Sequence, residues 1–149
     1  AYGGFNIFKF TKDKVTVTPI SLKSSTQKEL ENNSLLFRLG DRKHSAGILN
    51  AQIRAINKSK PDTIEALHSA KDLALKMRDV LKQNDLVSFY KIINDGWKVK
   101  KQFTKGVSNT MIDNVSKVAF SSGASALKVT GNLEDDSFLV LIALESTLC

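Results

Sequence analysis

The chain has 149 residues, of which 42% are hydrophobic, so it is the size of one ordinary domain and can bury a common core. Its apolar stretches near the start are interrupted by Lys9, Lys12 and Lys14, and it has no run of 18 apolar residues, which argues against a membrane span or a secretory leader. The single cysteine, Cys149, offers no intrachain disulfide and no cysteine cluster for zinc. We therefore expect a soluble protein of the reducing cytoplasm, without membrane partners.

The net charge is +7, from 22 Lys and Arg against 15 Asp and Glu, and it favours attraction to phosphates. The segment 97–105 is the best candidate for nucleic-acid binding, because its lysines are interleaved with Trp97 and Phe103. Both aromatics fit a helical pattern, so we expect them in the core with the lysines solvated outside. Nucleic-acid binding is therefore not favoured.

The first third of the chain predicts three strands. Two β-rich runs, 5–10 and 15–20, flank a short polar turn and predict a hairpin. The polar stretch 21–33 shows no strong periodicity, which predicts a loop or a weakly ordered excursion. A third strand over 35–39 ends at Gly40.

Four helical patterns follow, each with apolar residues spaced for one face. The expected faces are, in chain order, Ile48, Ala51, Ala55 and Ile56; then Ile64, Leu67, Ala70, Ala74, Met77 and Leu81; then Leu86, Phe89, Ile93 and Trp97; then Met111, Ile112, Val115, Val118 and Ala119.

Capping residues mark the ends of these helices. Asp62 with Glu65 three residues later predicts a capping box at the start of the second helix. The third starts near 84–85 and the fourth near 108–109, and Gly123 predicts the end of the fourth.

Two last strands are expected around 127–130 and 138–144. The second is apolar without alternation, which predicts a central strand covered on both faces. Because the helices are grouped rather than alternating with strands, the order favours an α+β fold: a single domain over 1–149, with an antiparallel sheet and a group of four helices on one side.

No complete enzyme active site is evident. His68 and Asp72 are one helical turn apart, but two ligands are too few for a metal site and the spacing is common. His44 lies at a strand-to-helix junction, and Ser121 and Ser122 stand where a helix is expected to end rather than in a nucleophile elbow.

Glycines and cations indicate a binding site more clearly than these histidines and serines do. Gly3 and Gly4 would let the backbone approach a ligand closely. Arg42 and Lys43 stand between a strand end and a helix start, which suits an anion held by N–H groups and positive charge. An ordinary polar helix cap explains the same residues equally well.

The ordered set of motifs resembles the C-terminal part of the GHMP sugar kinases, and most closely the D-glycero-D-manno-heptose 7-phosphate kinases. Each motif alone is weak, and the resemblance depends on their order over nearly the whole chain. The matching segments are 2–6, 19–20, 35–37, 45–49 with the basic residue before them, Gln52, 65–68, 94–101, 108–109, 112–113, 123–124 and 128–131.

This resemblance implies an ATP-dependent kinase that phosphorylates the anomeric hydroxyl of a sugar already bearing a phosphate. It implies a ferredoxin-like C-terminal domain whose partner is an N-terminal kinase domain with the nucleotide loop and catalytic aspartate. Because the chain starts at Ala1 rather than Met, we expect a fragment lacking that domain, with the 1–20 hairpin at the junction. ATP and Mg²⁺ are implied for the whole enzyme, and we expect neither to bind this fragment tightly.

The resemblance also assigns substrate-side roles to individual residues. Lys43 stands where the family usually has an arginine; lysine holds a phosphate as a point charge without the bidentate fork. The assigned residues are Arg42 and Lys43 for the sugar phosphate, Lys128, Thr130 and Gly131 near the reacting end, and Gly3 and Gly4 beside the missing aspartate.

The segment after Gly131 departs from the family. Further glycines are expected there, whereas this chain has Asn132, Glu134, Asp135 and Asp136. Adjacent carboxylates would repel phosphates unless a cation intervened, although such residues are more often a solvated turn. The alternative is therefore a degenerate, non-catalytic binding or regulatory module with the same fold. Surface exposed by a missing domain also leaves room for a homo-oligomer.

Overall fold

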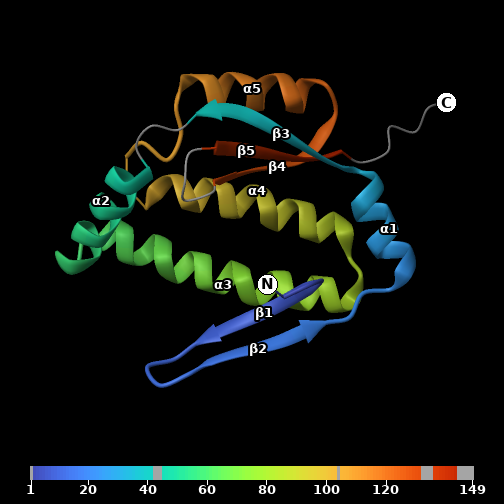
Figure 1. Cartoon of the computed structure of the whole chain (residues 1–149), viewed down its shortest axis with the longest axis horizontal. Helices are drawn as coiled ribbons and strands as arrows, with labels where there is room; N and C mark the ends of the chain where they lie inside the picture. The colour runs from blue at the N-terminus through green and yellow to red at the C-terminus, as the bar shows by residue number, and fades with distance from the viewer. Residues whose placement is uncertain (1, 42–44, 104, 132–135, 144–149) are drawn as a thin grey trace.

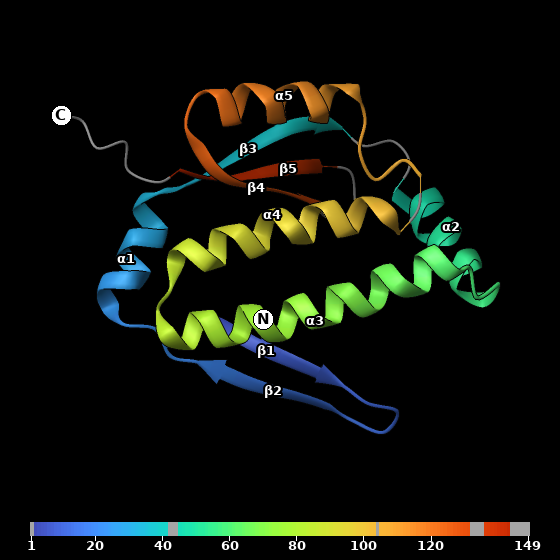
Figure 2. The same cartoon turned by 180° about the vertical axis from the view of Figure 1, so that it is seen from behind.

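The computed structural model describes residues 2–41, 45–103, 105–131 and 136–143, with backbone alone for 39–41, 45–46, 48, 131 and 136–143. Figures 1 and 2 show a hairpin, two long helices, a small sheet and a further helix in successive layers. The elements are β1 (Phe5–Phe10), β2 (Val15–Ile20), α1 (Ser24–Asn32), β3 (Ser34–Asp41), α2 (Ser45–Asn57), α3 (Pro61–Gln83), α4 (Leu86–Gln102), α5 (Thr110–Ser121), β4 (Ala124–Gly131) and β5 (Asp136–Ala143).

The predicted hairpin is confirmed. β1 and β2 pair antiparallel, with Phe5 opposite Ile20 and Phe10 opposite Val15. Phe5 and Ile20 belong to the hydrophobic core under the hairpin, whereas Phe10 is 74% exposed on the other face. One face of the hairpin is therefore anchored on the helices, and the other lies open.

The helix α1 corrects the sequence prediction of a loop over 21–33. Among its residues, Thr26 and Leu30 are buried, and these two lie one helical turn apart. Its start is tied to a distant turn, because Lys23 N–H donates to Asn84 Oδ1 at 2.8 Å. Two buried positions are too few to give a clear helical period in the sequence. Contacts with distant residues therefore stabilise this helix.

The second sheet has the strand order β3-β5-β4, and all its pairs are antiparallel. This confirms both the central place of the last strand and the expected α+β fold. Leu127 and Val129 of β4 pack with Ile112 and Ala119 of α5, so α5 covers one face of the sheet. The helices α3 and α4 lie between this sheet and the hairpin, as both views show.

Side-chain caps begin two helices where the sequence predicts them. Asn109 Oδ1 accepts from Ile112 N–H at 2.9 Å, and Asp85 Oδ1 accepts from Ser88 N–H at 3.1 Å. The capping box at Asp62 is wrong: α3 starts at Pro61, and its N-cap Lys60 makes no side-chain cap bond. Proline suits this first helical position because its missing N–H would have no partner there.

Some expected core positions are exposed. Met111 is 52% and Val118 65% exposed on α5, although Ile112 and Ala119 are buried. A helix against one face of a three-stranded sheet buries a narrower stripe than the sequence contains. Among the described residues, no helix is long and apolar enough to cross a membrane.

The Asp85 cap predicts a pH dependence. The pKa of Asp85 is lowered, first by the hydrogen bond with the Ser88 side chain and then by that with Ser88 N–H. The cap therefore adds stability above an aspartate's ordinary pKa of about 3.9, and loses it as the pH falls through the lowered folded value. Urea unfolding from pH 6 to pH 2 should show wild type losing stability relative to Asp85→Asn. Parallel pH curves for the two proteins would contradict this.

Candidate functional site

A cavity of about 560 Å³ opens between β1, α3 and α4, and a side chain of β4 reaches its wall. Most of the lining is apolar. The lining residues include Phe5, Ile7 and Phe8 of β1, Leu73, Met77 and Leu81 of α3, and Phe89, Ile92, Ile93 and Trp97 of α4. A concave apolar site with a few polar groups is the usual form of a small-molecule site.

The polar lining is basic. Arg78, Lys100 and Lys128 line the cavity with Asn6, and no carboxylate is among its described lining residues. Arg78 shares its charge with the adjacent Asp79, at 2.7 Å from Nε to Oδ1. That contact raises the pKa of Arg78, first through the side-chain hydrogen bond. The cavity wall therefore favours an anionic group.

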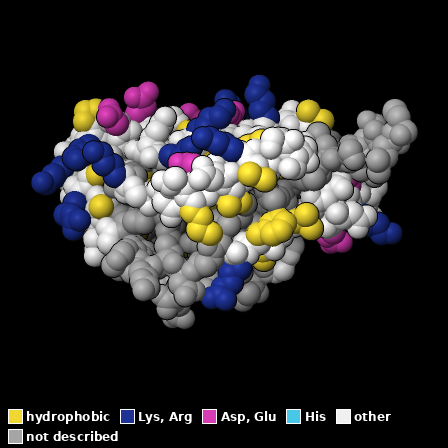
Figure 3. All heavy atoms as spheres, turned by 90° about the horizontal axis from the view of Figure 1, so that it is seen from above, with side chains coloured by type: hydrophobic (Ala, Val, Ile, Leu, Met, Phe, Trp, Pro, Cys, Tyr) yellow, Lys and Arg dark blue, Asp and Glu magenta, His cyan; other side chains and the backbone are white. Residues whose placement is uncertain are grey.

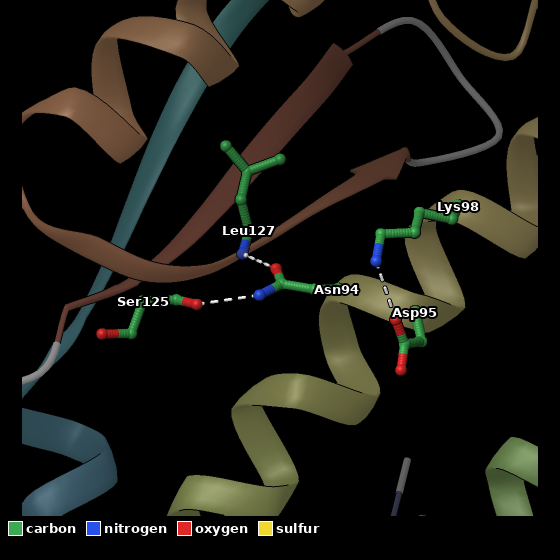
Figure 4. A network of polar contacts seen from close by, with 5 residues as sticks. All are labelled: Asn94, Asp95, Lys98, Ser125 and Leu127. Carbon is green, nitrogen blue, oxygen red and sulfur yellow. Dashed lines mark hydrogen bonds and ion pairs between the residues drawn. The ribbon is translucent and has the colours of Figure 1, made fainter.

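The helix α4 runs along the outer edge of β4 and bonds to its backbone. Asn94 Nδ2 donates to Ser125 C=O at 2.8 Å, and Leu127 N–H donates to Asn94 Oδ1 at 3.1 Å, as Figure 4 shows. Lys100 Nζ donates to Val129 C=O at 3.3 Å, and it lies 5.9 Å from the Trp97 ring centroid. These contacts join the apolar wall of the cavity to the strand that carries Lys128.

Trp97 has the structural role that its helical spacing predicts. It is 7% exposed and packs with Leu127 and Val129, and the lysines Lys98 and Lys101 lie exposed outside. Lys100 differs from the prediction, because it is half-buried against β4 rather than solvated.

The structure brings only some of the predicted site residues together. Lys128 lines the cavity, whereas Thr130 and Gly131 lie farther along β4 and do not line it. Gly3 and Gly4 immediately precede β1, which forms another wall. Gly4 has φ +72°, a conformation that favours glycine, and Asn6 Nδ2 donates to Gly3 C=O at 2.9 Å.

Two predicted features lie outside the described residues. These are the cations Arg42 and Lys43 with the neighbouring His44, and most of the acidic segment, 132–135. Asp136 begins β5 and is described by its backbone alone. The predicted phosphate contact of Arg42 and Lys43 therefore stays a prediction.

No group of three or more His, Cys, Asp or Glu in the described part could hold a metal ion. His68 is exposed on α3, and Ser121 and Ser122 end α5 as the sequence predicts. The described cavity has cations on an apolar wall, which suits an anionic ligand.

Sequence reasoning missed Arg78 and Lys100 as cavity residues, and Asn94 as a contact of β4. All three lie on helices whose buried faces were predicted, but the partner of each polar side chain is distant in sequence. Asn94, for instance, bonds residues 31 and 33 positions away. One signal was present: Lys100 follows Trp97 by three residues, which places it on the same side of the helix.

No family model matches the sequence, but a curated protein and solved structures are similar to it. The D-glycero-alpha-D-manno-heptose 7-phosphate kinase of Campylobacter jejuni is 29% identical over 131 residues, which are 87% of this chain and 38% of that protein. The chain thus spans well under half of this curated relative's length.

Solved structures of sugar kinases are also similar to this chain. A D-glycero-D-manno-heptose 1-phosphate kinase from Bacteroides thetaiotaomicron matches with a TM-score of 0.61 and 26% identity, over 96% of this chain and 35% of that one. A putative sugar kinase from Campylobacter jejuni matches with a TM-score of 0.66 and 25% identity, over 96% and 39%. The resemblance inferred from the ordered motifs is confirmed.

Proposed function

Because the chain is related in sequence and fold to the heptose-phosphate kinases, we propose that it forms the sugar-phosphate side of such a kinase. Its substrate is a heptose phosphate or a similar sugar phosphate. The nucleotide and its metal bind to another part of the enzyme, the N-terminal kinase domain that the resemblance implies. Phosphoryl transfer requires nucleotide, metal and acceptor to be positioned together. The 149 residues alone are then inactive.

One observation carries this proposal. Lys128 of β4 and the strand that follows Gly3 and Gly4 line the same cavity, although they are about 120 positions apart in the sequence. The resemblance assigns both segments to the substrate side. The sequence alone does not predict that they meet.

The lining of the cavity suits a sugar phosphate. An ammonium group holds a phosphate as a point charge, and Lys128 offers one on a wall without described carboxylates. The half-buried aromatic residues of the lining, Phe5 and Phe103, offer apolar surface for the C–H faces of a sugar. The positive net charge of the chain draws the anionic substrate towards it.

Replacing Lys128 with methionine tests the proposal. The change removes the charge but keeps a long side chain, so affinity for D-glycero-D-manno-heptose 7-phosphate should fall about tenfold, or ~1.4 kcal/mol. Calorimetric titration of the 149-residue chain measures it. Lys117→Met, on the exposed face of α5 away from the cavity, is the matched control.

Two results would contradict this division of roles. One is equal affinity of wild type, Lys128→Met and Lys117→Met for the heptose phosphate. The other is tight binding of Mg–ATP by the 149-residue chain, because the proposal assigns that site to another part of the enzyme.

The second candidate is a non-catalytic binding or regulatory module with the same fold. The acidic residues Glu134, Asp135 and Asp136 favour it, because they stand where the family has glycines. Phosphoryl transfer by a longer protein that carries the natural 132–137 segment would exclude this candidate. Activity that appears only after glycines are restored there would support it.

A further inference from the structure

We propose that Asn94 and Lys100 are positioning residues, which hold the outer edge of β4 and thereby place Lys128 in the cavity. This inference rests on the proposed function, in which Lys128 binds the phosphate of the sugar. Asn94 does not line the cavity, whereas Lys100 lines it and also bonds the backbone of β4. Each acts through the backbone of β4.

β4 is an outer strand of its sheet. β4 pairs with β5 on one side only, and no strand pairs with its other edge in the described part of the chain. An edge strand presents N–H and C=O groups that need partners. Here α4 lies beside that edge, and its side chains supply them.

Asn94 bonds this edge as a neighbouring strand would. Its amide donates to Ser125 C=O and accepts from Leu127 N–H, at 2.8 and 3.1 Å. An asparagine side chain offers both a donor and an acceptor, so one residue satisfies two backbone groups. Figure 4 shows the amide between the two groups, with its neighbour Asp95 turned towards Lys98 instead.

The bonded groups flank Lys128. Leu127 N–H is held by Asn94, and Val129 C=O is held by Lys100 at 3.3 Å. Leu127 and Val129 are almost fully buried, at 0% and 1% exposure, whereas Lys128 between them is exposed and lines the cavity. The backbone on both sides of Lys128 is therefore fixed, while its side chain is left to face a ligand.

The experiment uses Asn94→Leu, which keeps the size of the side chain but loses both bonds. Its matched control is Asp95→Asn, at the next position of α4, which breaks only the exposed pair with Lys98 at 2.9 Å. Lys100→Met is a second test variant in case Asn94→Leu fails to fold. Heptose 7-phosphate affinity is measured for each variant, with Lys128 and with Lys128→Met.

We expect Asn94→Leu and Lys100→Met to weaken binding about tenfold when Lys128 is present, and by less than about twofold in the Lys128→Met background. Asp95→Asn should change affinity in neither background. A purely structural role predicts equal losses in both backgrounds, or folded variants with unchanged affinity. Either of those results overturns the proposal.

A second readout does not depend on the substrate. Exchange of the Leu127 amide proton and the side-chain NMR signals of Lys128 should both change in Asn94→Leu, and neither should change in Asp95→Asn. If wild type binds no heptose phosphate, the proposed function fails. The Leu127 exchange and the Lys128 signals still test the positioning role in that case. Unchanged Lys128 signals in a folded Asn94→Leu or Lys100→Met variant would refute it.

Discussion

Replacement of Trp97 with alanine is expected to cost about 3–5 kcal/mol of unfolding free energy, a large share of the roughly 5–15 kcal/mol that stabilises a typical domain. Trp97 is 7% exposed and packs with Leu127 and Val129. It also lines the cavity and lies within 5.9 Å of Lys100 Nζ. Its removal therefore leaves a hole where helix, sheet and candidate site meet.

Urea unfolding followed by circular dichroism measures this loss. Val87→Ala is the matched control, because Val87 lies on the same helix but is 71% exposed, and it should change stability by less than about 0.5 kcal/mol. Trp97→Phe should fall between the two, since it keeps a ring in the site. A loss below about 1 kcal/mol for Trp97→Ala would contradict the role assigned to this side chain.

The 149-residue chain is expected to self-associate through β3, and Leu36→Lys should weaken this association at least about tenfold. The described part of the chain has no strand beyond β3 at its end of the sheet. Leu35, Leu36 and Phe37 of β3 are 55%, 63% and 44% exposed.

An apolar strand with one open edge is a template for pairing with another strand, and a lysine there is a common natural protection. Figure 3 looks down on α5 and β3 and shows hydrophobic side chains at the surface of this side. Sedimentation velocity at several concentrations measures the association. Leu49→Lys, at a residue of α2 that is 48% exposed, is the control. A monomeric wild type, or equal effects of both substitutions, would disprove pairing through β3.

Most of the secondary structure could be predicted from the sequence, because its patterns are local. The hairpin has two β-rich runs and a polar turn, and the starts of α4 and α5 have the capping residues Asp85 and Asn109. Gly123, with φ +96°, ends α5 as predicted. The central place of β5 agrees with its sequence, since an apolar strand without alternation indicates a strand covered on both faces, as central strands usually are.

Prediction failed where few positions contact the core. The helix α1 has only Thr26 and Leu30 buried, and its start is held by Asn84, a residue 61 positions away. Met111 and Val118 fit an apolar stripe, but α5 has only one sheet face to cover. In both cases a contact with a distant segment outweighed the local pattern.

The candidate site was likewise predictable only in part. The sequence by itself determined the residue types: glycines near the start, lysines around a tryptophan, and Lys128 on a late strand, in an order that resembles the heptose-phosphate kinases. Only the tertiary structure decided that Lys128 shares a cavity with β1, and that Asn94 and Lys100 hold the strand beside it. The physical reason is that periodicity and capping act over a few residues, whereas a cavity wall and the partners of a strand edge depend on how whole elements pack.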